Sequence, residues 1–121
     1  MAKFQRNGWH TVTPRIVVQD PKALIDFLKK VFHAQGEFRA GAPAEIRIGD
    51  SLVMVSGGGG LRDATPAFLY VYVDDADSCY QRAIATSEAT SLEEPSDRPY
   101  GDRRAMVKDS WGNTWQIATC K

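Results

Sequence analysis

The feature that most constrains the fold is an internal repeat within a chain of 121 residues. The segment Val18-Gln19-Asp20 is similar to Tyr72-Val73-Asp74, which follows it by 54 residues, and Ile48-Gly49-Asp50-Ser51 is similar to Val107-Lys108-Asp109-Ser110, 59 residues further on. The two spacings differ by an insertion of the size that a surface loop tolerates. The repeat therefore predicts two copies of one supersecondary unit. A chain of this length forms a single domain, so we expect the copies to share one core.

The first copy has the pattern of a strand, a helix and three further strands. Residues 11–19 alternate with a period of two, which is typical of a half-buried strand. Asp20-Pro21 begins a helix, because Asp caps free backbone amides and Pro is tolerated at the first helical position. An apolar stripe at helical spacing runs from Leu24 to Phe32. The three strands that follow are expected at 37–39, 44–48 and 52–55.

The second copy repeats this order after a run of four glycines. Its acidic cap is Asp74-Asp75, and its remaining elements are expected as strand 68–73, helix 76–86 and strands 89–92, 104–108 and 114–119. The predicted fold class is α+β, with two tandem βαβββ modules that form a cupped mixed sheet and carry their helices on its convex face. We expect one domain over 1–121, made of module one at about 9–56, a glycine-rich linker at 57–66 and module two at about 67–119.

Composition excludes several classes of function. Hydrophobic residues make up 43% of the chain and charged residues 25%, as in soluble globular proteins. Fifteen Lys and Arg balance fifteen Asp and Glu, so there is no positive surplus for nucleic acid or an anionic membrane. The chain shows no signal peptide and no apolar run near the roughly 20 residues of a membrane span, which predicts a cytoplasmic protein. Cys79 and Cys120 are expected to be free thiols.

Four motifs carry a resemblance to a known superfamily: Asp20-Pro21, Ala44–Ser51, Tyr100–Arg103 and Asp109–Trp115. Together with the repeat, they resemble the vicinal oxygen chelate superfamily of glyoxalases, extradiol dioxygenases and bleomycin-resistance proteins, and within it the glyoxalase/bleomycin-resistance-like branch. The resemblance covers nearly the whole chain, although Ser110 stands where the usual pattern has proline. It implies the fold described above, a small-molecule ligand in the cup, and a homodimer whose modules pair within or between chains.

The resemblance also implies where a metal would be held. The family's enzymes bind a divalent ion from positions that fall here on Thr13 and Phe68 in the first strand of each module, and on Met54 and Gln116 in the last strand. Only Gln116 offers a ligand, whereas a catalytic site takes about three from His, Glu, Asp or Cys. The prediction is therefore no metal site and no cofactor.

Two enzyme hypotheses remain open beside this prediction. A metal-dependent lyase, isomerase or dioxygenase would need a different strand register, in which residues such as His10, Glu45 and Gln116 hold the ion. A metal-free acid/base enzyme would use Glu45 as its base, with a pKa raised by burial in an apolar cup. Whether the chain is an enzyme is thus left open by the sequence.

Alternation along the strands indicates which side chains face the cup. Phe68, Tyr70 and Tyr72 form an aromatic wall on the face away from the helices, where a solvent-exposed strand would carry charges. Such a wall suits a partly aromatic ligand oriented by polar side chains, which predicts binding or sequestration of a small molecule. The alternatives are a cup filled by the protein's own side chains or a dimer interface. The predicted ligand-binding residues are Arg15, Arg47, Met54, Phe68, Tyr70, Tyr72, Tyr100, Arg104 and Gln116.

The loop at Tyr100–Arg103 is expected at the mouth of the cup. Its Asp102 either helps to close the loop over a ligand or fixes the turn by accepting from backbone amides. Trp115 falls on the side that faces the helices, which predicts a structural role.

Overall fold

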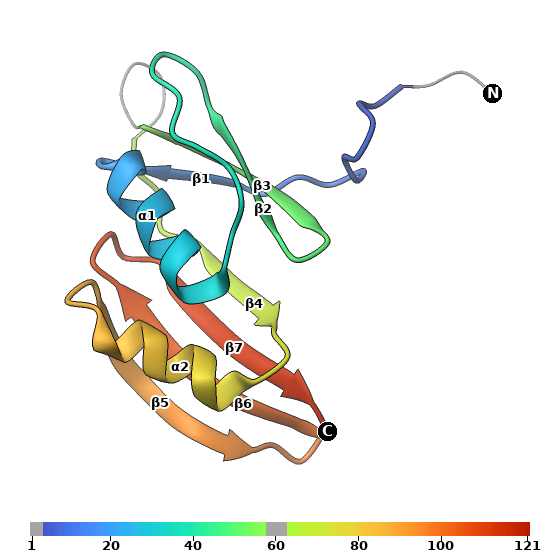
Figure 1. Ribbon diagram of the computed structural model, residues 1–121, viewed down its shortest axis with the longest axis vertical. Helices are drawn as coiled ribbons and strands as arrows, with labels where there is room; N and C mark the ends of the chain where they lie inside the picture. The colour runs from blue at the N-terminus through green and yellow to red at the C-terminus, as the bar shows by residue number, and fades with distance from the viewer. Residues whose placement is uncertain (1–3, 58–62) are drawn as a thin grey trace.

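The structure is a computed structural model that describes residues 4–57 and 63–121. Its elements are β1 (Arg15–Val18), α1 (Pro21–Phe32), β2 (Ala44–Ile48), β3 (Ser51–Gly57), β4 (Phe68–Tyr72), α2 (Ala76–Ala85), β5 (Ala89–Asp97), β6 (Asp102–Asp109) and β7 (Thr114–Cys120). The strands form a three-stranded sheet of order β1-β3-β2 and a four-stranded sheet of order β4-β7-β6-β5. Figure 1 shows α2 lying across one face of the four-stranded sheet. The predicted α+β class with tandem modules is confirmed. Neither helix in these two ranges has the length and apolar character needed to cross a lipid bilayer.

Both modules begin their helix in the same way. Asp20 accepts a hydrogen bond from the backbone N–H of Ala23 at 3.1 Å, and Asp75 accepts one from the N–H of Ser78 at 3.1 Å. The N-cap of α2 is therefore Asp75, one residue beyond the aspartate on which the repeat was first aligned. Each aspartate satisfies an amide that the first turn of a helix leaves free.

Module one contains one strand fewer than predicted. No strand forms at 37–39; an isolated bridge instead joins Gln35 to Arg47, with N–H to O distances of 2.9 and 2.8 Å. Gly36 turns the chain away at a φ of 132°, a conformation that side chains with a Cβ rarely adopt. A Cβ there would also lie 2.5 Å from the backbone oxygen of Glu45. The segment that follows is consequently a loop rather than an edge strand.

Other boundaries also differ from the prediction. The first strand covers Arg15–Val18 alone, because residues 11–14 do not pair as a strand. The strand expected at 89–92 extends to Asp97 and passes through two register shifts, which local alternation does not reveal. The predicted linker at 57–66 lies partly outside the described residues. Within the described part, Gly57 ends β3 and Thr65 forms a bridge with Val17.

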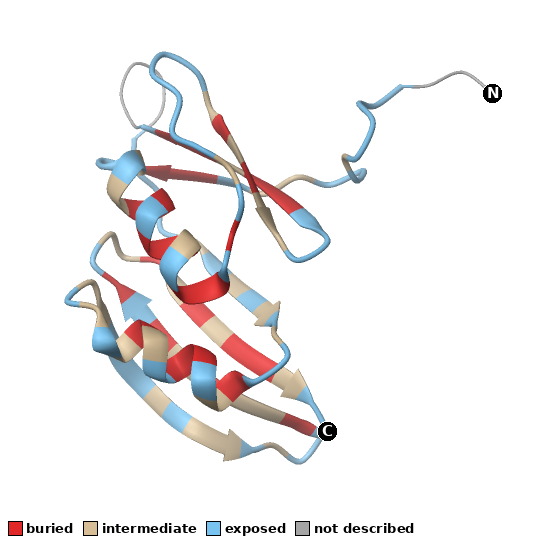
Figure 2. Ribbon diagram, viewed as in Figure 1, coloured by how far each residue is buried: buried red, intermediate tan, exposed pale blue. Residues whose placement is uncertain are grey.

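The core joins the two modules through their helices. The rings of Phe32 and Trp115 lie 5.3 Å apart, and the carbonyl oxygen of Val31 accepts from the thiol of Cys79 and from Arg82 Nε at 3.0 Å. Trp115 is fully buried, as its predicted structural role requires. Figure 2 shows the buried residues gathered where α1 and α2 meet the sheets. The helix-covered faces thus hold most of the buried side chains, but they are not fully closed. A cavity of about 350 Å³ reaches them beside β4, where Ile48, Val53, Leu69 and Val71 are among its lining residues.

A hydrogen-bonded turn connects β6, β7 and the start of β4. The Oδ1 atom of Asp109 accepts from the N–H groups of Trp111 and Asn113, both at 2.9 Å. Its Oδ2 atom accepts from Asn113 Nδ2 at 2.9 Å and from Trp115 Nε1 at 2.8 Å. Asn113 Oδ1 in turn accepts from the N–H of Ala67 at 2.9 Å. Because Asp109 and Asn113 are both buried, these donors and acceptors depend on one another.

We expect Asp109→Ala to lower the free energy of unfolding by about 3 kcal/mol or more, because several buried donors lose their acceptor. The matched control is Asp50→Ala in the corresponding hairpin of module one, where the exposed carboxylate accepts from Ser51 Oγ at 3.0 Å. That change should cost less than about 0.5 kcal/mol. Urea unfolding of both variants measures the difference, and equal losses would contradict the role given to Asp109.

Candidate functional site

Three aromatic side chains on β4 form the most distinctive open surface of the described structure. Phe68, Tyr70 and Tyr72 are 65%, 37% and 63% exposed, whereas Leu69 and Val71, which alternate with them, pack against the core. The rings of Tyr70 and Tyr72 meet edge to face, with centroids 5.4 Å apart. We call Phe68, Tyr70 and Tyr72 the aromatic face. Consecutive exposed aromatic rings are uncommon on a surface that contacts only water.

A buried carboxylate holds two of these phenols. The hydroxyls of Tyr70 and Tyr72 donate to Asp102 Oδ2 at 2.6 and 2.7 Å, and Asp102 is only 5% exposed. Asp102 begins β6, which is separated from β4 by β7 in the sheet order. Its side chain therefore reaches past β7 to the phenols. This role differs from the two that the sequence suggested, closing the loop over a ligand and fixing the turn. The two tyrosine side chains are held in place before any ligand arrives.

The hydrogen bonds continue towards β5. The hydroxyl oxygens of Tyr70 and Tyr100 lie 3.3 Å apart, and Arg104 NH1 donates to Tyr100 Oη at 3.1 Å. Arg104 NH2 donates to Glu93 Oε1 at 2.8 Å. The side chain of Arg104 is 13% exposed, and its buried Nε has no hydrogen-bond partner within the described residues. We call the connected set the tyrosine network; its members are Tyr70, Tyr72, Tyr100, Asp102, Arg104 and Glu93.

The network raises the pKa of two of its phenols, Tyr70 and Tyr72. Burial, followed by the hydrogen bond to Asp102, raises the pKa of Tyr70. The hydrogen bond to Asp102 is the main cause of the raised pKa of Tyr72. At neutral pH both phenols are protonated, so each donates its hydrogen bond to the Asp102 carboxylate.

The other predicted ligand-binding residues lie on two different sheets. Arg15, Met54 and Arg47 belong to the three-stranded sheet, where Met54 pairs in register with Arg15 on one side and Glu45 on the other. Gln116 belongs to the four-stranded sheet, in register with Tyr70. The nine predicted residues therefore divide between the two sheets. Module two contributes Phe68, Tyr70, Tyr72, Tyr100, Arg104 and Gln116, and module one contributes Arg15, Arg47 and Met54.

Glu45 does not have the raised pKa expected of a buried base. Arg6 NH2 lies 2.6 Å and Arg39 NH1 3.2 Å from Glu45 Oε2. The hydrogen bond from Arg6 is the main cause of a lowered pKa for Glu45. The sequence predicted a raised pKa for Glu45, and this direction was wrong. The guanidinium groups of Arg6 and Arg39 stabilise the charged carboxylate, and both reach Glu45 from outside its own strand.

The donor chemistry of the described residues does not fit a catalytic metal ion. The positions implied by the superfamily offer the hydroxyl of Thr13, the thioether of Met54, the ring of Phe68 and the amide of Gln116. Across residues 4–57 and 63–121, no three His, Cys, Asp or Glu side chains cluster as metal ligands would. Of the alternative ligand set, His10 is exposed ahead of β1, Glu45 is engaged by arginines, and Gln116 lies on the other sheet.

Two members of the tyrosine network, Asp102 and Glu93, were not among the predicted ligand-binding residues, although Asp102 was expected at the mouth of the cup. Asp102 alternates with Arg104 and Met106 along β6, and Arg104 had already been assigned to the ligand face. The same alternation could have placed the Asp102 carboxylate beside the phenols. Glu93 carried no such signal, because a register shift on either side of it breaks the period-two pattern of β5.

The family model for the Glyoxalase/Bleomycin resistance protein/Dioxygenase superfamily matches residues 9–117. The chain belongs to this superfamily. The uncharacterized protein Mb0911c of Mycobacterium bovis is 30% identical to it, over 88% of this chain and 80% of that protein. The uncharacterized protein Rv0887c of Mycobacterium tuberculosis is also 30% identical, over 88% of this chain and 72% of that protein.

Solved structures share the fold at lower sequence identity. TioX from Micromonospora sp. ML1 superposes with a TM-score of 0.78 at 24% identity, covering 93% of this chain and 99% of TioX. The fosfomycin resistance protein FosX from Listeria monocytogenes, solved with Mn(II) and sulfate, gives a TM-score of 0.73 at 14% identity, over 93% of this chain and 90% of FosX. At these identities, the similarity shows the fold alone.

The raised pKa values predict a pH dependence. A phenol whose pKa is higher in the folded than in the unfolded state adds stability below the unfolded value of about 10, and this stability is lost as the pH rises above it. We therefore expect at least two of the four tyrosines to resist ionisation above pH 10 while the protein stays folded. Ultraviolet absorbance of tyrosinate, followed beside circular dichroism, measures this. Asp102→Asn should move the ionisation to lower pH; an unchanged titration would contradict the network.

Proposed function

We propose that the protein binds a small, partly aromatic organic molecule on the aromatic face, without a metal ion. The observation that carries this proposal is the joint exposure of Phe68, Tyr70 and Tyr72, two of which are held by the buried Asp102. Exposed rings that are already ordered stack on a planar ligand at little cost in conformational entropy. Gln116, which is half-buried and in register with Tyr70, supplies an amide that orients the ligand in this proposal.

A second copy of the chain would complete the cup in this proposal. The residues predicted from module one, Arg15, Arg47 and Met54, lie on a different sheet from the aromatic face. Pairing module one of one chain with module two of another would bring both sets to a single site, as closed two-fold symmetry allows. The edge of β4 away from β7 pairs with no described strand and supports such an arrangement. The exposed thiol of Cys120 supports a reducing compartment such as the cytoplasm.

The enzyme hypotheses have less support from the described residues. Glu45, paired with two arginines and with a lowered pKa, is a weak base near neutral pH. Its contacts support a role in anchoring the segment that contains Arg6. FosX, a member of the same fold, was solved with Mn(II), but the corresponding positions here offer a single amide ligand at Gln116.

Metal content tests the metal-free part of the proposal. We expect elemental analysis of untagged protein to find close to no metal per subunit, and thermal unfolding to be unchanged by added Zn, Ni, Mn or Fe, because the donor set is inadequate. About one metal ion per subunit, lost in His10→Ala or Glu45→Gln, would instead favour the metal-dependent enzyme.

Ligand binding tests the aromatic face. For an aromatic compound selected by thermal-shift screening, Tyr70→Ala should weaken binding by about tenfold or more, because a stacking ring and its buried area are lost. The matched control is Leu92→Ala, which removes an exposed apolar side chain from β5. Sedimentation velocity with absorbance of the ligand reports affinity and oligomeric state together. Unchanged affinity in Tyr70→Ala would contradict the aromatic site, and a monomer would contradict the shared cup.

A further inference from the structure

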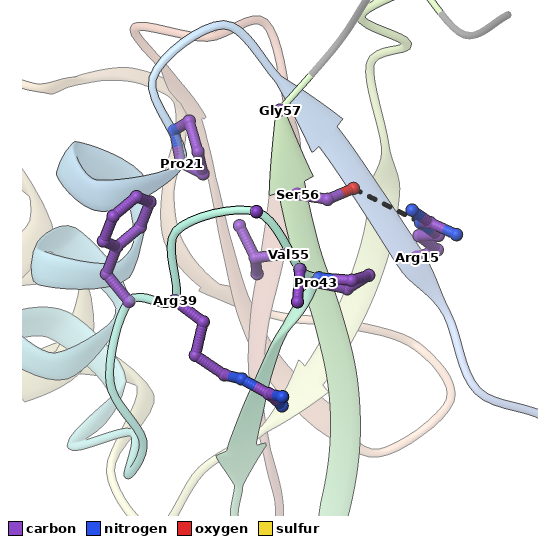
Figure 3. Close-up of a pocket in the computed structure, with 10 residues that line it drawn as sticks. Arg15, Pro21, Arg39, Pro43, Val55, Ser56 and Gly57 are labelled. Carbon is purple, nitrogen blue, oxygen red and sulfur yellow. Dashed lines mark hydrogen bonds between the residues drawn. The ribbon is translucent and has the colours of Figure 1, made fainter.

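A cavity of about 380 Å³ lies on module one and shares no lining residue with the aromatic face. Its size falls in the range of pockets that hold small molecules. Figure 3 shows the residues around it, with Ser56 directed towards Arg15. The lining comes from β1, β3, the start of α1 and the loop before β2, and consists of Arg15, Pro21, Phe38, Arg39, Gly41, Ala42, Pro43, Val55, Ser56 and Gly57.

The charge of this lining is entirely positive. Arg15 and Arg39 are its two charged residues, and it includes no Asp or Glu, although the chain as a whole has a formal charge of zero. The two arginines therefore give the described lining a local excess of positive charge, with Glu45 beside Arg39 at its margin. Arg15 donates through Nε to Ser56 Oγ at 3.2 Å, which orients its guanidinium. A guanidinium with remaining N–H groups matches the geometry of an organic carboxylate.

The loop that carries Arg39 is held at several points. Gly36 and the bridge between Gln35 and Arg47 set its start. Lys29 Nζ then lies 2.7 Å from Glu37 Oε1. Arg39 contacts Glu45 at 3.2 Å, but Arg6 contacts the same oxygen at 2.6 Å. Glu45 therefore keeps a closer partner if Arg39 turns towards an anion in the cavity.

The remaining lining is largely apolar. Phe38 is exposed, Val55 is buried, and Pro21 and Pro43 add rigid apolar surface. An occupant that suits this lining has one anionic group and an apolar body. We infer that the cavity binds a small organic monocarboxylate, with its carboxylate between Arg15 and Arg39 and its apolar part against Phe38 and Pro43. Arg15 is also among the residues that a second copy would bring to the aromatic face, whereas Arg39 is not, so Arg39→Gln is the variant that separates the two sites.

Benzoate and its uncharged analogue benzamide are suitable probes for the chain of 121 residues. Amide spectra of ¹⁵N-labelled protein should show saturable shifts at Gly41, Ser56 and Gly57 with benzoate, and binding at least about tenfold weaker with benzamide, which lacks the charge. Arg15→Gln and Arg39→Gln should each weaken benzoate binding about tenfold. Lys108→Gln removes the same charge from an exposed site on β6 outside the cavity and should leave binding unchanged.

Three outcomes would overturn the inference. These are equal binding of benzoate and benzamide, unchanged benzoate affinity in Arg15→Gln and Arg39→Gln, and loss of affinity in Arg104→Gln alone. The last outcome would assign the carboxylate to the aromatic face. The same spectra report whether each variant is folded, so loss of binding is separated from loss of structure. Failure of this site leaves the tests with Tyr70→Ala unaffected.

Discussion

The contact on which the rest of the structure depends is the burial of Trp115 between the two modules. Its indole packs 5.3 Å from the ring of Phe32, and its N–H is satisfied by the buried carboxylate of Asp109 at 2.8 Å. A tryptophan can be buried completely only when its single donor has a partner. This contact and the bonds from α2 to Val31 fill the space between the helices and the sheets, and the two proposals rest on surfaces outside it, the aromatic face and the cavity beside the loop before β2.

The two modules repeat one arrangement but have different surface chemistry. In module two, β4 exposes three aromatic rings, and Asp102 and Arg104 order the phenols beside them. In module one, the corresponding strand β1 exposes Arg15, and the loop before β2 adds Arg39. Two modules with similar buried residues can carry different exposed residues, because the buried residues determine the packing. This difference underlies the two separate proposals, a planar ligand on module two and a carboxylate on module one.

Much of the fold was predictable because it depends on local spacing. Alternation assigned Trp115 to the side that faces the helices and the aromatic face to the open side. The prediction of a strand at 37–39 was wrong because the alternation of apolar and polar residues there gives no sign of the turn at Gly36. For Glu45, local sequence suggested a burial effect, whereas the structure brings Arg6 to it from 39 positions away. A pKa depends on such distant charges at least as much as on burial.

The sequence by itself determined the tandem repeat, the helix caps, the buried faces of β4 and β7 and the scarcity of metal ligands at the superfamily's metal positions. These properties follow from residue type and from periods of 2 and 3.6 residues, which are local. Only the tertiary structure decided that Asp102 holds two phenols, that Glu45 is paired with arginines, and that the predicted ligand residues divide between two sheets. These depend on pairing between strands and loops distant in sequence, which hydrophobic periodicity does not encode.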